Sequence, residues 1–152
     1  LGTFAVVGTV TAIAGVLLLV RRRFAETLVL VAGSLLTLAA VQVTKALVDR
    51  PRPSIAVYDP MGSSYPSGHA AHAVAFVAIA VIFSRTASRR TQLISVGAAL
   101  ALTIAMGATR LYLGVHYLSD VLGGYGLGAS IFAVAGMVAL IVTFIRHNPA
   151  SR

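Results

Sequence analysis

The sequence predicts an all-α protein, a bundle of transmembrane helices that forms one domain over residues 1–152. Hydrophobic residues make up 58% of the chain and charged residues 11%, against roughly 45–50% and about 25% in a soluble domain. The mean hydropathy is correspondingly high, at +0.91. The apolar residues form long runs without the period-two alternation of barrel strands. Because backbone groups must be hydrogen-bonded within lipid, these runs are predicted to be helices.

Five apolar stretches are long enough, or nearly so, to cross a bilayer, which takes roughly 17–25 helical residues. In chain order they are Leu1–Val20, Phe24–Val48, Ser67–Phe83, Gln92–Thr109 and Val121–Ile145. The first has no basic segment before it and no clear cleavage site, so we interpret it as a membrane helix rather than a signal peptide. Gly124 and Gly128 in the last stretch are spaced for close helix packing.

Basic residues between the stretches predict the orientation of the bundle. They follow the first, third and fifth stretches: Arg21, Arg22 and Arg23; Arg85, Arg89 and Arg90; and Arg146 and Arg152. The positive-inside rule places these groups and the C-terminus in the cytoplasm, so loops 49–66 and 110–120 face outward. With five spans Leu1 would lie outside. One more helix upstream is expected, because it would restore an even number of membrane spans. The net charge of +8 is spread over short gaps between apolar runs, which favours membrane lipid over nucleic acid as partner.

Polar residues gather where the predicted helices end on the outer side. Lys45 lies on the last turn of the second stretch, and Arg52 follows in a loop that contains Pro51 and Pro53. The third stretch opens with the segment Tyr65-Pro66-Ser67-Gly68-His69. Proline and serine are typical of a helix start, and a helix N-terminus with a glycine can bind an anion through backbone N–H groups. His69 is expected to project from the first turn.

A third polar cluster begins at Arg110 and contains His116 and Asp120, which are four residues apart. If this segment is helical, both side chains share one face, and Asp120 can accept a hydrogen bond from one ring nitrogen of His116. The other nitrogen would then be free to act as a nucleophile or base. Charged residues near membrane segments are costly and usually mark a functional site.

The residue types narrow the chemistry to phosphate. Lys45, Arg52 and Arg110 offer three cations to one anion, and arginine matches the geometry of phosphate oxygens. The chain has no cysteine and only four carboxylates, which leaves little material for a metal site. We therefore expect no metal and no other cofactor, with His116 attacking phosphorus and His69 protonating the leaving oxygen. Positioning and charge stabilisation supply most of the catalysis in phosphoryl transfer.

These three clusters resemble the motifs of the type 2 phosphatidic acid phosphatase family. The chain carries Lys45-x6-Arg52-Pro53, then Pro66-Ser67-Gly68-His69, then Thr109-Arg110-x5-His116-x3-Asp120, with threonine where the family has serine. The resemblance implies a lipid phosphatase in which His116 is the nucleophile, Asp120 its partner and His69 the general acid. It implies phosphate binding by five residues: Lys45, Arg52, Ser67, Gly68 and Arg110. The vanadium-dependent haloperoxidases share this architecture but are largely soluble.

Several alternatives stay open in the sequence. Candidate substrates are polyprenyl pyrophosphate, phosphatidylglycerol phosphate and phosphatidate. The same histidine could pass phosphate to an acceptor hydroxyl, and a protein that only binds anionic lipid is a further possibility. Arg50 is interpreted as an interfacial anchor or a secondary lipid contact, and His72 as a packing residue or a support to the site. His147 is expected in a solvated tail, Tyr58, Asp59 and Met61 at the entrance, and Tyr112, Tyr117 and Tyr125 at the membrane interface.

Overall fold

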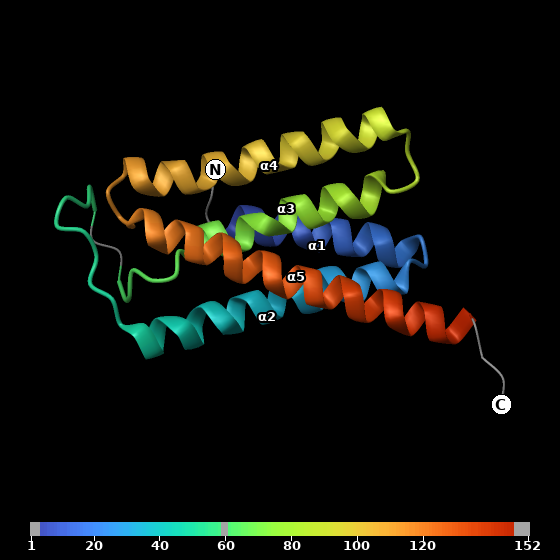
Figure 1. Ribbon diagram of the computed structural model, residues 1–152, viewed down its shortest axis with the longest axis horizontal. Coiled ribbons are helices and arrows are strands. Elements are labelled where there is room, and N and C mark those ends of the chain that lie inside the picture. The colour runs from blue at the N-terminus through green and yellow to red at the C-terminus, as the bar shows by residue number, and fades with distance from the viewer. Residues whose placement is uncertain (1–3, 59–60, 148–152) are drawn as a thin grey trace.

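The computed structural model describes residues 4–58 and 61–147, and Asp59 lies outside the described residues. This part of the chain folds into five helices joined by loops (Figure 1). The helices are α1 (Phe4–Val20), α2 (Phe24–Val48), α3 (Gly68–Ser84), α4 (Arg89–Tyr112) and α5 (Leu118–His147). The predicted all-α class is confirmed, with α4 and α5 extending beyond the predicted stretches at both ends.

Helix length separates the five helices into two groups. By length and composition α2, α4 and α5 can cross a membrane, whereas α1 and α3 are apolar helices of 17 residues each. Large apolar side chains such as Leu28, Leu47 and Leu140 lie exposed on the outside of the bundle. An exposed apolar surface of this extent fits contact with lipid rather than water.

The central helix is α3, which packs against each of the other four helices. Its buried residues include four alanines, of which Ala70, Ala71 and Ala73 are fully buried. Small side chains let neighbouring backbones approach closely, because lipid gives helices no hydrophobic reason to associate. α3 therefore fixes the positions of α2, α4 and α5 relative to one another.

α3 and α5 approach each other closely at the predicted glycine pair. A Cβ atom added to Gly124 would lie 2.5 Å from the Ser67 carbonyl oxygen, and one added to Gly128 would lie 2.4 Å from the Ala71 carbonyl oxygen. Both distances are far inside van der Waals contact, and both neighbours are backbone atoms. The start of α5 can lie against the start of α3 only because these positions carry no side chain.

The loops lie at the two ends of the bundle (Figure 1), and these ends differ in their polar contacts. At the end that holds the α1–α2 and α3–α4 loops, Glu26 of α2 makes ion pairs with Arg23 at 3.1 Å and with Arg85 at 2.9 Å. These bridges tie the start of α2 to the segment just after α3. At the opposite end lie loop 49–67 and loop 113–117, so the predicted alternation of the loops between two ends is confirmed.

Candidate active site

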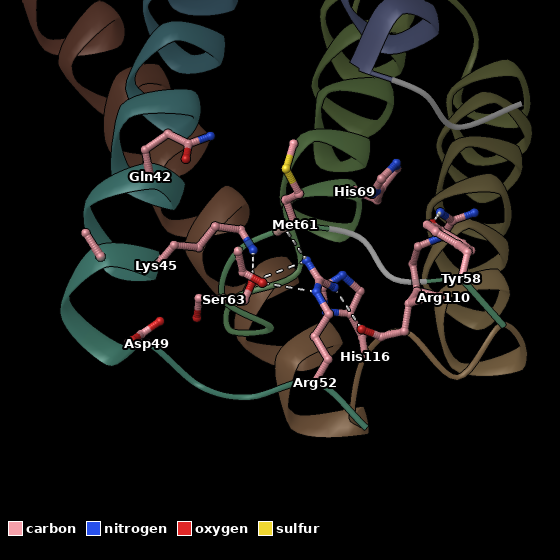
Figure 2. Close-up of a pocket in the computed structure, with 14 residues that line it drawn as sticks. Gln42, Lys45, Asp49, Arg52, Tyr58, Met61, Ser63, His69, Arg110 and His116 are labelled. Atoms are coloured by element: carbon pink, nitrogen blue, oxygen red, sulfur yellow. Dashed lines mark hydrogen bonds between the residues drawn. The ribbon is translucent and has the colours of Figure 1, made fainter. Parts of the chain in front are cut away.

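The polar residues at the second end surround one pocket with a volume of about 490 Å³ (Figure 2). Six of the predicted site residues line it: Lys45, Arg52, Gly68, His69, Arg110 and His116. They come from α2, loop 49–67, α3, α4 and loop 113–117. Residues separated by up to 71 positions in sequence, Lys45 and His116, therefore face one space.

Ser67 and Asp120 lie behind the pocket wall rather than on it. Both are fully buried. The hydroxyl of Ser67 caps α3 by accepting a hydrogen bond from Ala70 N–H, as the sequence predicted for a helix start. The backbone N–H of Ser67 donates to the Asp120 carbonyl at 2.9 Å. This bond joins the N-terminus of α3 to the first turn of α5, so the two halves of the site are held as one unit.

The N-terminus of α3 faces the pocket through Gly68 and His69. The first N–H groups of a helix have no partner within the helix, and they combine with the helix dipole to attract an anion. Gly68 is buried and carries no side chain, so a ligand can come close to this backbone. The sequence prediction of a helix start at this position is confirmed.

Lys45 and Arg52 are held at the pocket wall by loop carbonyls, and Arg110 is held by the residue before it on α4. Lys45 Nζ donates to the Ser63 carbonyl, and Arg52 donates to the carbonyls of Gly62 at 3.1 Å and Val115 at 2.9 Å. Arg110 Nε donates to the hydroxyl of Thr109 at 3.2 Å. Threonine at position 109 therefore keeps a hydroxyl that orients the neighbouring guanidinium. Figure 2 shows Lys45 and Arg52 pointing toward His116, with Arg110 on the other side of the pocket.

His116 lies in loop 113–117, within the outward loop predicted at residues 110–120, so a shared helix face is not what brings it to Asp120. The chain leaves α4 and reverses through Gly114, whose φ of +65° is unfavourable for residues with a side chain. A Cβ atom added to Gly114 would also lie 2.7 Å from the Ile55 carbonyl oxygen. The turn still brings His116 close to Asp120, with Nδ1 3.6 Å from the carboxylate oxygen Oδ2. This leaves Nε2 as the ring nitrogen that is available to the pocket.

Asp120 is surrounded by donors that the sequence analysis did not assign to the site. Arg50 Nη1 lies 2.7 Å from Oδ1, while the Ser64 hydroxyl at 2.5 Å and Tyr117 N–H at 2.8 Å donate to Oδ2. Arg50 also stacks on the Tyr117 ring at 4.2 Å. Arg50 therefore has a specific partner within the protein, which its interpretation as an interfacial anchor or lipid contact did not include. A hint was present, because Arg50 is a basic residue on the predicted outer side, but nothing in the sequence singles out Ser64.

His116 lies outside the helices, and its surroundings favour the neutral imidazole. Burial and then the positive charges of Arg52 and Lys45 lower the pKa of His116 from 6.5 to about 4, against an opposing effect of Asp120. Only 7% of its surface is exposed. A neutral ring is what a nucleophile requires, because a protonated nitrogen has no lone pair to donate.

The predictions for the other tyrosines and histidines and for Met61 have different outcomes. Tyr125 donates from its hydroxyl to the Thr103 carbonyl at 2.8 Å, so it joins α5 to α4 within the bundle and is not an interfacial residue. His72 Nδ1 lies 2.7 Å from the Gly68 carbonyl, on its own helix. Tyr58 and Met61 line the pocket, as expected for residues at an entrance. The side chain of His147 lies outside the described part of the structure.

The fold and the site together define a class: a membrane-embedded helical bundle with a cationic, histidine-bearing pocket at one end. The sequence profile of the PAP2 superfamily matches residues 26–146, and the chain belongs to this superfamily. The resemblance drawn from the three motifs is thus confirmed.

Two relatives with assigned names share much of this sequence. The chain is 34% identical over 134 residues to decaprenylphosphoryl-5-phosphoribose phosphatase of Mycobacterium tuberculosis, covering 85% of this chain and 70% of that one. It is 31% identical over 96 residues to phosphatidylglycerophosphatase B of Bacillus subtilis. That match covers 60% of this chain but only 47% of the Bacillus protein, so the chain matches about half of that relative's length.

Two crystal structures resemble the fold. The transmembrane PAP2-type phosphatidylglycerolphosphate phosphatase from Bacillus subtilis superposes with a TM-score of 0.80 and 25% identity, over 88% of this chain and 69% of that one. LpxE of Aquifex aeolicus superposes with a TM-score of 0.64 and 23% identity, over 91% and 78% of the two chains, and it supports the fold alone. The Bacillus protein is named as a transmembrane protein, in agreement with the architecture of this chain.

Proposed function

We propose that this protein is an integral membrane lipid phosphatase that uses His116 to form a phosphohistidine intermediate. One observation carries the proposal: His116 is buried on the wall of a pocket that also holds Lys45, Arg52 and the N-terminus of α3, and burial and the two cations lower its pKa to about 4. Only an anion balances the positive charge of these groups, and phosphate has enough oxygens to accept a hydrogen bond from each of them.

In the proposed reaction, Nε2 of His116 attacks phosphorus while the bond from phosphorus to the lipid oxygen breaks. His69 gives a proton to that leaving oxygen. A water molecule then attacks the phosphohistidine, returns a proton to His69 and breaks the N–P bond, which releases inorganic phosphate. Lys45, Arg52 and Arg110, together with the backbone at Ser67 and Gly68, stabilise the charge on the transferred phosphoryl group. Asp120 contacts the His116 ring on the side that faces away from the phosphate, and it holds the ring in position. No step needs a metal.

The relatives point toward one kind of substrate. By their names, both act on lipids whose terminal phosphate sits on a hydroxylated headgroup, glycerol in one and ribose in the other. The pocket has matching polar groups beyond the phosphate cations, namely Gln42 and Asp49 at the end of α2. We propose a terminal phosphomonoester of this kind as the preferred substrate, with polyprenyl pyrophosphate and phosphatidate as the alternatives to compare. The pocket is proposed to face outward, with the C-terminus in the cytoplasm.

The proposed function is tested by phosphate release from purified protein in detergent micelles that contain EDTA. The panel is phosphatidylglycerol phosphate, a prenyl-phosphoryl phosphoribose, a polyprenyl pyrophosphate and phosphatidate. We expect full activity after chelation, because among the described residues no group of three or more His, Asp or Glu side chains could hold a metal. Activity that returns only with a divalent metal would contradict the mechanism. Transfer of phosphate to added alcohol without any release would favour a phosphotransferase.

The pH dependence of kcat/KM is a second test of the His116 assignment. The neutral form is active and the pKa of His116 is lowered to about 4, so activity should persist well below pH 6.5 and fall only as the pH approaches about 4. The profile must be corrected for ionisation of the substrate phosphate. Arg52→Gln should move the acid limb to higher pH, because it removes a charge that opposes protonation. A limb near 6.5 that stays in place in this variant would refute the assignment.

A further inference from the structure

The carboxylate of Asp120 is fully buried, and its two oxygens are bound by different groups. Oδ1 faces the guanidinium of Arg50 at 2.7 Å. Oδ2 accepts from the hydroxyl of Ser64 at 2.5 Å and from Tyr117 N–H at 2.8 Å. The bond from Tyr117 N–H is local, since a residue on the first helical turn often accepts from the N–H at the helix start. The other two donors come from loop 49–67.

Arg50 has contacts that fix its own position. Its guanidinium stacks on the Tyr117 ring at 4.2 Å and donates to the Ser119 hydroxyl at 2.7 Å. Its backbone N–H donates to the Ser63 hydroxyl at 3.0 Å, and its carbonyl accepts from Ser64 N–H at 2.8 Å. Arg50 does not line the phosphate pocket. It is therefore placed to balance the charge of Asp120 without touching a bound phosphate.

Ser64 lies between the two members of the His–Asp pair. Its hydroxyl oxygen is 3.5 Å from His116 Nδ1, about as close as the carboxylate oxygen of Asp120 at 3.6 Å. Because the Ser64 hydroxyl donates to Asp120, its lone pairs remain to accept from an Nδ1–H of His116. This geometry favours the His116 tautomer that carries its proton on Nδ1 and leaves Nε2 with a lone pair.

We propose that Arg50 and Ser64 are positioning residues for the His116–Asp120 pair: Arg50 holds the Asp120 carboxylate from one side, and Ser64 joins it to His116 on the other. This inference rests on the proposed function, in which His116 is the nucleophile. It assigns a task to two residues of loop 49–67 that do not line the pocket.

The charges around His116 determine what loss of Arg50 should do. Lys45 from α2, Arg52 from loop 49–67, Arg110 from α4 and His69 from α3 share the pocket with His116, and Asp120 from α5 lies behind it. Asp49, which follows α2, also lines the pocket. Among the residues that the structure describes, Asp120 is the one carboxylate in direct contact with the ring. Without Arg50 its charge acts more strongly on His116 and favours the imidazolium. The titration midpoint of His116 should therefore rise in Arg50→Gln and return in Arg50→Lys, which restores the positive charge.

The test compares full-length wild type with Arg50→Gln, Arg50→Lys and Ser64→Ala in detergent micelles. Two matched controls are Arg85→Gln, which breaks an arginine–carboxylate bridge at the opposite end, and Ser54→Ala, which alters an exposed serine of the same loop. Nitrogen-15 NMR follows the titration and tautomer of His116, assigned with a His116→Gln sample. Steady-state kinetics on the best substrate give kcat and KM, and thermal melts report the folded state.

We expect kcat to fall roughly 10- to 100-fold in Arg50→Gln and Ser64→Ala, the usual cost of losing a partner that orients an active residue. KM should change little, and both controls should match wild type. Each substitution should also lose its effect in an Asp120→Asn background, because both residues act through that carboxylate. A loss of kcat that persists in that background, with an unchanged His116 titration, would identify a merely structural role and overturn the proposal.

Different results would refute the phosphatase activity and the positioning role of Arg50 and Ser64. If wild type hydrolyses lipid phosphate while Arg50→Gln and Ser64→Ala keep the wild-type kcat and titration, the positioning role is refuted and the phosphatase stands. If wild type hydrolyses none of the lipids, the phosphatase is refuted. The NMR titration still decides the positioning role in that case: a shift in Arg50→Gln that reverses in Arg50→Lys supports it, and no shift overturns it.

Discussion

Replacing His116 with alanine should reduce phosphate release by roughly 10⁴-fold or more, the scale on which loss of a nucleophile acts in other enzymes. His116 is the pocket histidine backed by a buried carboxylate, with Asp120 Oδ2 3.6 Å from its Nδ1. Alanine removes the lone pair that attacks phosphorus but leaves Lys45, Arg52 and the α3 N-terminus in place. Substrate binding should therefore survive while turnover does not.

Rapid mixing with radiolabelled substrate, followed by an alkaline quench, measures both turnover and the phosphoenzyme. Wild type should retain label on the protein that is stable to alkali and lost in acid, the behaviour of a phosphohistidine, and His116→Ala should retain none. His147→Ala is a suitable control, since position 147 is at the far end of α5. Label that remains on the His116→Ala protein would mean that another residue is the nucleophile.

Replacing Gly128 with alanine should damage both stability and activity, although the change adds a single methyl group. That group would lie 2.4 Å from the Ala71 carbonyl oxygen, which belongs to the backbone of the central helix and cannot rotate away. Forcing extra atoms into a packed contact costs about 1–3 kcal/mol. The start of α5 carries Asp120 and the start of α3 carries His69, so separating the helices misaligns the site. A displacement of about 1 Å can lower the rate about 100-fold.

Gly126 provides the matched comparison on the same helix. A Cβ atom added there meets nothing within 4 Å. Gly126→Ala should be neutral or slightly stabilising, because alanine favours a helix by about 1 kcal/mol over glycine. The test measures the thermal unfolding of both variants in detergent and the kcat of each. Equal melting temperatures and equal rates for the two would show that the close approach of α3 and α5 is not needed.

The sequence by itself determined the class of fold and most of the pocket. Long apolar runs predict helices wherever they occur, since lipid leaves the backbone no other partner, and Ser67 predicts the start of α3 because a cap is a local interaction. Lys45, Arg52, Gly68, His69, Arg110 and His116 were identified because each lies at a helix end or in a short motif. Local signals of this kind depend on neighbours in the chain, and a sequence displays those directly.

Only the tertiary structure decided how the site is supported. Arg50 was read as an anchor at the membrane surface, yet it pairs with Asp120 across 70 residues of sequence, and Ser64 reaches the same carboxylate across 56. Tyr125 was placed at the interface, yet its hydroxyl donates to α4 inside the bundle. His116 and Asp120 meet through a turn at Gly114 rather than along one helix. These contacts arise where α5 meets α4 and loops 49–67 and 113–117, and the spacing of residues along one chain does not specify which side chains will face each other there.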